Sequence, residues 1–389
     1  MTDKKSAPQL EASYTTDLLI VGGGIVGLWC AQRAAKRGLK TTLIDKGKIG
    51  QGASGGFLGA LMPHQPVRWS EEKQYQLEAL LALENEVASL EEQTGINCGY
   101  LRSGRVIPTR TEKKRAERLT WRDAAKLNWP AKTHSHQPLQ WRVEEEPPTG
   151  DWLASEMAPL GYEFDTMTAR VAPRQLVQAL RATISPNVKI LENTAVTDLA
   201  DGTLITLQDG SKIAAAKTIV AAGHHAFPLI ENTAQKNLGR GVKGQAALLK
   251  PLHSVAADQP IIYFGGVYII AHDNGLIAIG STSEKRFTSP TDTDHQLDDL
   301  IEKATELCQT LEGAEVVERW AGVRPNATGR HPMIGPLPIA PNIIMATGGF
   351  KISFGVAHKM ADDAIAFATG EQPTLPKMFQ IAYHEACAK

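Results

Sequence analysis

Three glycines in G-x-G-x-x-G spacing, Gly22, Gly24 and Gly27, follow directly after a run of four apolar residues. Glycines at this spacing let the backbone turn tightly, approach a phosphate closely and pack a following helix against the preceding strand. The N-terminus of such a helix attracts negative charge, which suits a pyrophosphate. A second predicted strand, residues 40–44, ends on Asp45, near the distance of about 20 residues at which a carboxylate accepts hydrogen bonds from a ribose. Together these features argue against a purely structural turn and predict a binding site for an adenine dinucleotide.

The composition is that of an ordinary globular protein with room for a large cofactor. The 389 residues are 42% hydrophobic and 21% charged, with a formal net charge of -1, so we expect two domains and no nucleic-acid partner. Cys30, Cys98, Cys308 and Cys387 have neither CxxC nor zinc-type spacing, which predicts neither a disulfide framework nor a metal site and favours the cytoplasm. Residues 1–16 lack the apolar core of a signal peptide and are expected to form a flexible tail. No apolar segment reaches the roughly 20 residues of a transmembrane helix.

The remaining segments must position the dinucleotide and its reaction partner. Residues 47–63 are rich in glycine and small side chains, which predicts a loop rather than a helix and allows close approach to a flat ligand. Residues 110–148 are charged and broken by four prolines, so we expect a peripheral part of the second domain there. Basic residues beside tryptophans in that segment could contact RNA, but neighbouring acids dilute the charge. The predicted helices are residues 71–93, 171–182, 297–311 and 355–367, and the predicted strands are residues 189–190, 196–199, 204–207, 211–213, 218–223, 244–249, 261–264, 267–272, 276–280 and 343–346.

Several short motifs occur in the order found in one known family. They are Gly52-Ala53-Ser54-Gly55, Val242-Lys243-Gly244-Gln245, Gly280-Ser281-Thr282, Trp320-Ala321-Gly322-Val323-Arg324-Pro325 and Gly348-Gly349-Phe350-Lys351. With the N-terminal glycine turn, they make nearly the whole chain resemble the FAD-dependent D-amino acid oxidase superfamily, and within it glycine oxidase and sarcosine oxidase.

The resemblance implies an α/β fold with two domains. One is an FAD-binding Rossmann-like domain of the glutathione-reductase type, built from separated segments, and the other is a substrate domain with an antiparallel sheet. The expected division is residues 1–16 as flexible tail, residues 17–85, 165–235 and 325–389 as FAD-binding domain, and residues 86–164 and 236–324 as substrate domain.

The resemblance also implies which residues bind FAD. Ile25 and Val26 would lie beside the pyrophosphate, Asp45 and Lys46 at the adenosine ribose, and the backbone of Val196 at the adenine. The last loop before the C-terminal helix would lie at the pyrimidine edge of the flavin, where a helix N-terminus stabilises negative charge. The segment that carries the covalent cysteine of monomeric sarcosine oxidases has no cysteine here, so non-covalent FAD is expected. The expected set is Gly22, Gly24, Ile25, Val26, Gly27, Asp45, Lys46, Ala53, Ser54, Leu58, Gly59, Ala60, Val196, Gly223, Gly349, Phe350, Lys351, Ile352, Ser353, Phe354 and Gly355.

A substrate carboxylate needs desolvated cationic partners, and a guanidinium can bind it through two parallel hydrogen bonds. Arg324 matches the carboxylate-binding arginine of the family, and Lys351 matches a second cationic position. Tyr268 and Tyr263 match tyrosines that contact the substrate, with a packed aromatic core as the alternative interpretation. Substrate-binding roles are therefore expected for these four residues.

The expected reaction is oxidation of the C–N bond of a small amino acid or N-substituted glycine to an imine. Hydride would pass to flavin N5, and O2 or another acceptor would reoxidise the flavin. Because the cofactor carries this chemistry, no catalytic residue is assigned. His64, His224 and His225 lie near family motifs and could assist loss of the amine proton, but isolated histidines are more often structural. Ala60 and Ser283 occur where glycine oxidases tend to have methionines, which predicts a roomier and more polar pocket.

Two alternatives remain open from the sequence. The chain could oxidise an amine on a protein or on tRNA, since the Gly52-Ala53-Ser54-Gly55 loop also resembles the oxidoreductase domain of a tRNA-modifying enzyme. It could also be a flavin-binding accessory protein without turnover.

Overall fold

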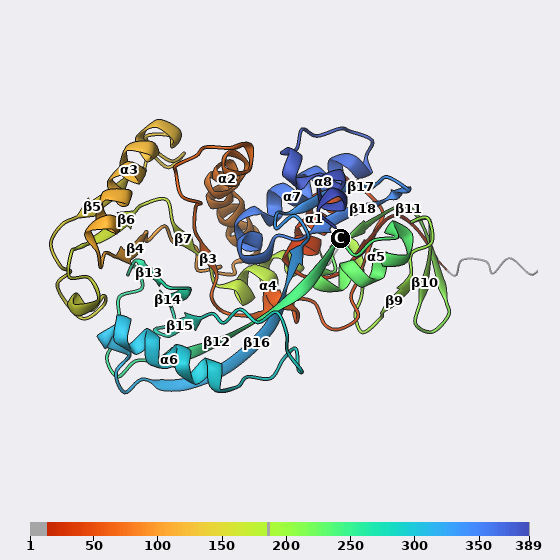
Figure 1. Ribbon diagram of the computed structural model, residues 1–389. Coiled ribbons are helices and arrows are strands. Elements are labelled where there is room, and N and C mark those ends of the chain that lie inside the picture. The colour runs from red at the N-terminus through yellow and green to blue at the C-terminus, as the bar shows by residue number, and fades with distance from the viewer. Residues whose placement is uncertain (1–13, 185–186, 389) are drawn as a thin grey trace, which may run out of the picture.

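Two eight-stranded sheets organise the protein, and each lies at the centre of one lobe (Figure 1). The computed structural model describes residues 14–184 and 187–388. The strands of the first sheet are β1 (Tyr14–Val21), β2 (Thr41–Ile44), β8 (Val188–Leu191), β9 (Val196–Asp198), β10 (Leu204–Leu207), β11 (Lys212–Val220), β17 (Met333–Leu337) and β18 (Ala340–Thr347). Strands β8, β2, β1, β11 and β18 are parallel neighbours in this order, and β17 pairs antiparallel with β18 at one edge.

Strand β1 is buried on both faces and separates two hydrophobic cores. Leu18 and Ile20 face a core shared with α1, α4 and α7, whereas Leu19 and Val21 face a core shared with α5 and α8. This alternation follows from the two-residue period of a strand, and a continuous apolar run is typical of a parallel sheet covered by helices on both sides. The helices of this lobe are α1 (Ile25–Lys36), α4 (Pro173–Ile184), α5 (Ala226–Ala234), α7 (Ser353–Ala368) and α8 (Ile381–Cys387).

The second sheet is antiparallel except where β4 and β13 pair in parallel. Its strands are β4 (Arg105–Pro108), β5 (Trp141–Glu144), β6 (Tyr162–Asp165), β12 (Gly239–Lys250), β13 (Ile261–Phe264), β14 (Val267–Ala271), β15 (Ile277–Gly280) and β16 (Glu315–Ala327). Helix α6 (His295–Leu307) covers one face, where Ile269 and Ile279 pack against Leu297 and Leu300. The opposite face turns toward the first lobe, and the long strands β12 and β16 reach across to it (Figure 1).

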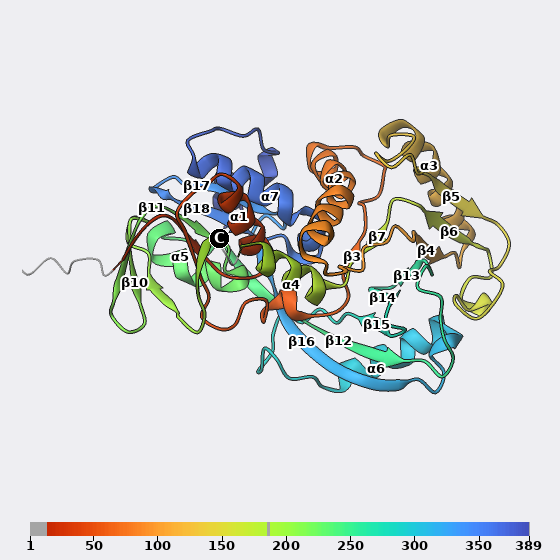
Figure 2. The same cartoon turned by 180° about the vertical axis from the view of Figure 1, so that it is seen from behind.

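The remaining elements connect the lobes. Helix α2 (Glu71–Thr94) stands between α3 (Glu112–Asn128) and α7 in both views (Figure 1 and Figure 2) and packs on α4 and α7. Strands β3 (Ala60–Leu61) and β7 (Ala169–Arg170) form a small two-stranded sheet. The 3-10 turns are η1 (Ala53–Gly55), η2 (Ser155–Met157), η3 (Gly223–His225), η4 (Gln309–Leu311), η5 (Phe350–Ile352) and η6 (Lys377–Phe379).

The expected α/β fold class is confirmed, with corrections at four places. Residues 14–16 belong to β1, because they pair with Ile213, Ala214 and Ala215, so they are no part of a flexible tail; residues 1–13 lie outside the described residues. The two strands predicted at residues 211–213 and 218–223 form one strand, β11, which pairs with β1 along its length. The predicted loop at residues 47–63 contains the turn η1 and the strand β3.

Helix α3 is the fourth correction, because the sequence predicted no helix between residues 110 and 148. Thr111 caps it by accepting a hydrogen bond from the Lys114 backbone N–H at 3.2 Å, and its prolines follow only after the helix ends. Trp121 and Trp129 each pack against Trp141 with ring centroids 5.3 and 5.8 Å apart, and all three are buried. Their faces are therefore not available to stack on RNA bases.

The two sheets suggest how the chain divides. We propose to keep the expected division but to move two boundaries, because α2 continues to Thr94 and β16 continues to Ala327. All four cysteines are free thiols. Within the described residues, no cluster of His, Cys, Asp or Glu is arranged for a metal ion, and no helix is long and apolar enough to cross a membrane.

Candidate functional site

A cavity of about 1150 Å³ runs between the two sheets. Asp45, Lys46 and Val196 line it where β2 ends, and Tyr263 and Tyr268 line it on the inner face of the second sheet. The cavity therefore begins at the carboxyl ends of the parallel strands, where open α/β sheets bind their ligands. Its far end lies against the second lobe, so one extended molecule could contact both lobes.

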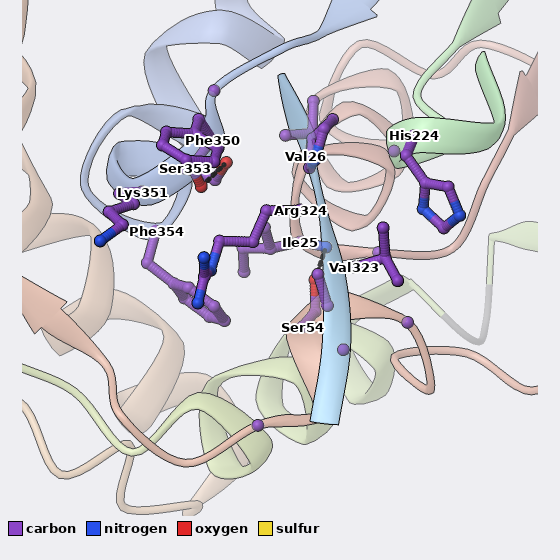
Figure 3. Close-up of a pocket in the computed structure, with 18 of the residues that line it drawn as sticks. Ile25, Val26, Ser54, His224, Val323, Arg324, Phe350, Lys351, Ser353 and Phe354 are labelled. Carbon is purple, nitrogen blue, oxygen red and sulfur yellow. Dashed lines mark hydrogen bonds between the residues drawn. The ribbon is translucent and has the colours of Figure 1, made fainter. Parts of the chain in front are cut away.

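The glycine turn forms the wall of this cavity beside α1. A Cβ on Gly27 would lie 1.8 Å from the Gly22 carbonyl oxygen, so only glycine lets α1 pack this close to the end of β1. The helix begins at Ile25 after Gly24, with no side-chain cap at Gly24 and no acidic residue in its first turn. Ser54 Oγ accepts a hydrogen bond from the Ile25 N–H at 2.9 Å (Figure 3). The positive end of the helix dipole is thus not neutralised by an acid and faces the cavity, which fits a pyrophosphate.

Asp45 links the glycine turn after β1 to the loop that follows β2, where both line the cavity. Its Oδ2 accepts from the Gly23 N–H at 2.7 Å and its Oδ1 accepts from the Gly47 N–H at 2.8 Å. Each carboxylate oxygen keeps a lone pair for a further donor such as a ribose hydroxyl. Lys46 Nζ lies 2.7 Å from His225 Nε2, and burial together with the Lys46 charge lowers the pKa of that histidine.

Arg324 reaches from β16 into the cavity on the side opposite to Val323 (Figure 3). Its Nη2 donates to Ser281 Oγ at 2.9 Å and to the Thr282 carbonyl oxygen at 3.1 Å. Within the described residues, its Nη1 is buried and has no hydrogen-bond partner. A buried guanidinium nitrogen without a partner is costly, and burial lowers the pKa of Arg324. An anionic acceptor in the cavity would therefore supply the hydrogen-bond partner that Nη1 lacks.

Lys351 supplies a second cation at the same place. Its Nζ lies 5.7 Å from the Tyr268 ring centroid, and burial together with the Arg324 charge lowers the pKa of Lys351 to about 8. The preceding residue, Phe350, has φ of +46°, which is uncommon for a bulky side chain and marks a constrained loop. Two neighbouring cations with depressed pKa values indicate a site built for a negatively charged group.

Two tyrosines form the floor of this end of the cavity. Tyr263 and Tyr268 pair across β13 and β14 with ring centroids 4.9 Å apart. Burial raises the pKa of Tyr268 to about 12, so its hydroxyl stays protonated and can donate a hydrogen bond.

The structure brings the predicted site residues together in one cavity, with a single exception. Every predicted FAD-binding residue lines it except Gly27, which acts through packing, and the four predicted substrate-binding residues line it as well. Ser283 is exposed and does not line the cavity, whereas Met62 does, so half of the argument for a more polar pocket is wrong. Two residues of the site were not predicted from the sequence: Ser281, which orients Arg324, and Arg105, which lines the cavity from β4.

Replacing Gly244 by alanine should displace the guanidinium of Arg324 while the arginine itself remains unchanged. A Cβ at Gly244 would lie 1.6 Å from Arg324 Nη2, and the flexible guanidinium rather than the backbone would give way. We expect FAD to remain bound and the dissociation constant of a small carboxylate to rise about tenfold, measured by titration of the flavin spectrum. Lys250→Ala at the exposed end of the same strand is the control. An unchanged dissociation constant in the Gly244→Ala protein would contradict this position of the guanidinium.

Comparisons with known proteins agree with this geometry. A family model described as FAD dependent oxidoreductase (DAO) matches residues 17–363. Glycine oxidase of Pseudomonas putida is 27% identical over 373 residues, which cover 92% of this chain and 96% of that protein. Glycine oxidase of Pseudomonas aeruginosa is 26% identical over 380 residues, with 92% and 96% covered. The crystal structure of glycine oxidase from Geobacillus kaustophilus has the same fold, with a TM-score of 0.81 at 21% identity over 93% of this chain and 97% of that one.

Proposed function

We propose, since this chain belongs to the DAO family of FAD-dependent oxidoreductases, that it oxidises the C–N bond of a small amino acid or N-substituted glycine to an imine and passes the electrons to O2. The observation that carries this proposal is that the Nη1 of Arg324, beside Lys351, is buried and has no hydrogen-bond partner within residues 14–184 and 187–388. Both cations lie in the cavity whose other end fits the pyrophosphate of FAD. A carboxylate adjacent to the reacting amine would supply the missing counter-charge.

FAD is the cofactor, and the chain offers residues suited to each part of it. The N-terminus of α1, which has no acidic residue in its first turn, would hold the pyrophosphate, and Asp45 would accept from the adenosine ribose. The N-terminal residues of α7, which also line the cavity, would contact the flavin. When bound, FAD supplies the acceptor for the hydride that leaves the α-carbon.

Side chains from both lobes would bind and orient the substrate. Arg324 would bind the carboxylate through Nη1, while Ser281 and the Thr282 carbonyl fix the guanidinium plane. Lys351 would donate to the same carboxylate, and Tyr268 would complete the donor set from below. Holding the carboxylate at one point fixes the position of the α-carbon, and this positioning is the main contribution of the protein to the rate.

The curated relatives support the same chemistry. By their names, the two bacterial relatives oxidise glycine, which carries an amine on the carbon next to its carboxylate. With O2 as acceptor, the overall reaction converts the amino acid, O2 and water into an oxo acid, an amine or ammonia, and hydrogen peroxide.

Binding of a carboxylate should weaken as the pH rises through about 8. Lys351 is protonated below its pKa of about 8 and becomes neutral above it, so the attraction for an anion is lost with increasing pH. Methoxyacetate, which has the shape of sarcosine with an ether oxygen in place of the amine, isolates this effect from titration of the substrate. We expect its dissociation constant to rise about tenfold above pH 8, because a charge-assisted hydrogen bond is lost. The Lys351→Arg protein should show no such rise, and an identical pH profile in both proteins would contradict the assignment.

Product analysis tests the proposed reaction. The purified FAD-loaded protein would be incubated with sarcosine, glycine, D-alanine or D-proline under air. Formation of the corresponding oxo acid in equal amount to hydrogen peroxide would support it. If the oxo acid forms only when another electron acceptor is added, that acceptor takes the place of O2 in the proposal. If no small amino acid gives a product, an amine on a protein or tRNA becomes the substrate to test.

A further inference from the structure

The end of the cavity near the second sheet contains more positive charge than one carboxylate requires. Arg324 and Lys351 suffice for the carboxylate of a simple amino acid, yet Arg105 and Lys73 also line the cavity. Among the lining residues that the structure describes, the one carboxylate is Asp45, beside the glycine turn. A cleft lined by one sign of charge concentrates ligands of the opposite sign.

Arg105 is held rigidly on the cavity side of the sheet. It pairs with Ile261 across β4 and β13, and Tyr263, two residues further along β13, lies on the same face. Its Nε donates to Asp165 Oδ2 at 2.7 Å, while Asp165 Oδ1 accepts from both the N–H and the hydroxyl of Thr168 at 2.8 Å. The guanidinium is almost fully buried and lies 5.3 Å from the Trp141 ring centroid.

The part of Arg105 that faces the cavity has only a weak acceptor. Its Nη1 lies 3.6 Å from the sulfur of Met62, which also lines the cavity. A thioether satisfies a guanidinium poorly, so this edge remains able to bind an anion. Burial, together with the smaller effects of the Lys73, His331 and Arg105 charges, lowers the pKa of His64 to about 4, and His64 lines the cavity as Arg105 does.

Tyr268 lies between the two arginines. Burial raises the pKa of its hydroxyl to about 12, and the charges of both Arg324 and Arg105 act against this increase. Ser281, which fixes Arg324, directly follows β15, and three strand spacings separate β15 from β4, which carries Arg105. At the usual strand separation this corresponds to roughly 14 Å between the backbones, and side chains extend inward from both sides.

The neighbouring Arg118 shows what a purely structural arginine in this cluster looks like. Its guanidinium stacks on Trp121 at 3.8 Å from the ring centroid and pairs with Glu163 on β6, and it does not line the cavity. Each buried carboxylate of β6 thus has its own arginine, and neither carboxylate faces the cavity. Arg105 differs because it pairs with Asp165 on one edge and opens to the cavity on the other.

We propose that the substrate carries a second anionic group, such as a distal carboxylate, which binds Arg105 across Tyr268 from the α-carboxylate. The proposal rests on the proposed function, because it takes Arg324 and Lys351 as the site of the first carboxylate. The substrate class is therefore an amino acid or N-substituted glycine with two acidic groups.

Binding of dicarboxylates without an amine tests this subsite apart from turnover. Succinate, glutarate and adipate would each be compared with the corresponding monoamide, which has the same shape and one charge fewer, by titrating the flavin spectrum of the FAD-loaded protein. For at least one chain length, the dicarboxylate should bind about tenfold more tightly than its monoamide. Equal binding of acid and monoamide at every length would overturn the proposal.

Variants identify Arg105 as the group responsible. In Arg105→Gln, which can still donate to Asp165, the preference for the best dicarboxylate over its monoamide should disappear. Arg142→Met is the matched control, because Arg142 lies on β5 of the same sheet with its side chain exposed and paired with Glu144. A preference that persists in Arg105→Gln would overturn the assignment. If that variant fails to bind FAD, the comparison of each dicarboxylate with its monoamide in the wild-type protein still tests the subsite, and equal binding of the two would overturn the proposal.

The proposed function can fail without this inference failing, and the converse also holds. An Arg105-dependent preference for dicarboxylates with no oxidation of any small amine would retain the subsite and reject the reaction. Oxidation of sarcosine without any preference for a second carboxylate would retain the reaction and reject the subsite.

Discussion

Replacing Arg324 by methionine is expected to weaken binding of methoxyacetate by about 30-fold or more, because removal of one partner of a buried charge pair costs roughly 2 kcal/mol or more. Methionine keeps the apolar stem and loses every donor. FAD should remain bound, since Arg324 contacts Ser281 and Thr282 rather than the glycine turn. The measurement is a titration of the flavin spectrum, with FAD content per chain checked first.

Arg319→Met is the matched control for this result. Arg319 lies on the same strand, is exposed and pairs with Asp298 at 2.5 Å, away from the cavity. It should bind methoxyacetate as the wild type does. Equal affinity in the Arg324→Met and Arg319→Met proteins would show that the carboxylate binds elsewhere.

Replacing Gly27 by alanine is expected to lower the FAD content of the purified protein. The new Cβ would lie 1.8 Å from the Gly22 carbonyl oxygen. The Cβ belongs to α1 and the oxygen to the backbone that directly follows β1, so neither atom can shift without moving packed backbone. Overpacking of this kind costs about 1–3 kcal/mol and shifts α1 away from β1, so FAD affinity should fall about tenfold or more. Because the N-terminus of α1 provides the anion site, even a small shift misplaces its N–H groups. FAD content and thermal unfolding temperature measure the two effects.

The control for Gly27→Ala is Lys36→Ala, which truncates an exposed side chain in the last turn of the same helix. It should keep both FAD and thermal stability. Full FAD content in Gly27→Ala would mean that α1 tolerates the extra methyl group and that packing at Gly27 does not support the cofactor site.

The local parts of the fold could be predicted from the sequence because short-range physics specifies them. The first and last residues of β10 and β13 were predicted correctly, because turn residues flank both apolar segments. Helix α3 was missed because nine of its residues are charged, and its buried face consists of Trp121 and Ala125 alone. Its stability comes from tertiary packing against β5 and β6, which a local pattern cannot reveal.

The residues of the candidate site likewise include some that a local sequence pattern predicts and others that it cannot. The glycine turn could be derived from spacing, whereas Arg324, Lys351 and the tyrosines were found only through the family resemblance. Arg105 was missed because its position depends on the pairing of β4 with β13, two strands far apart in the chain. No local signal gives the register of such a pair, because only the folded sheet places Arg105 on the same face as Tyr263.

Anaerobic reduction of the bound flavin tests the central claim most directly. The FAD-loaded protein would be mixed without oxygen with glycine, sarcosine, D-alanine, D-proline and a larger N-substituted glycine bearing a distal carboxylate, while the flavin absorbance is followed. The account predicts that at least one of these bleaches the flavin, and that the Arg324→Met protein bleaches much more slowly at the same concentration. An unchanged spectrum with every small amino acid, in protein that holds its full complement of FAD, would contradict a small-molecule amine oxidoreductase.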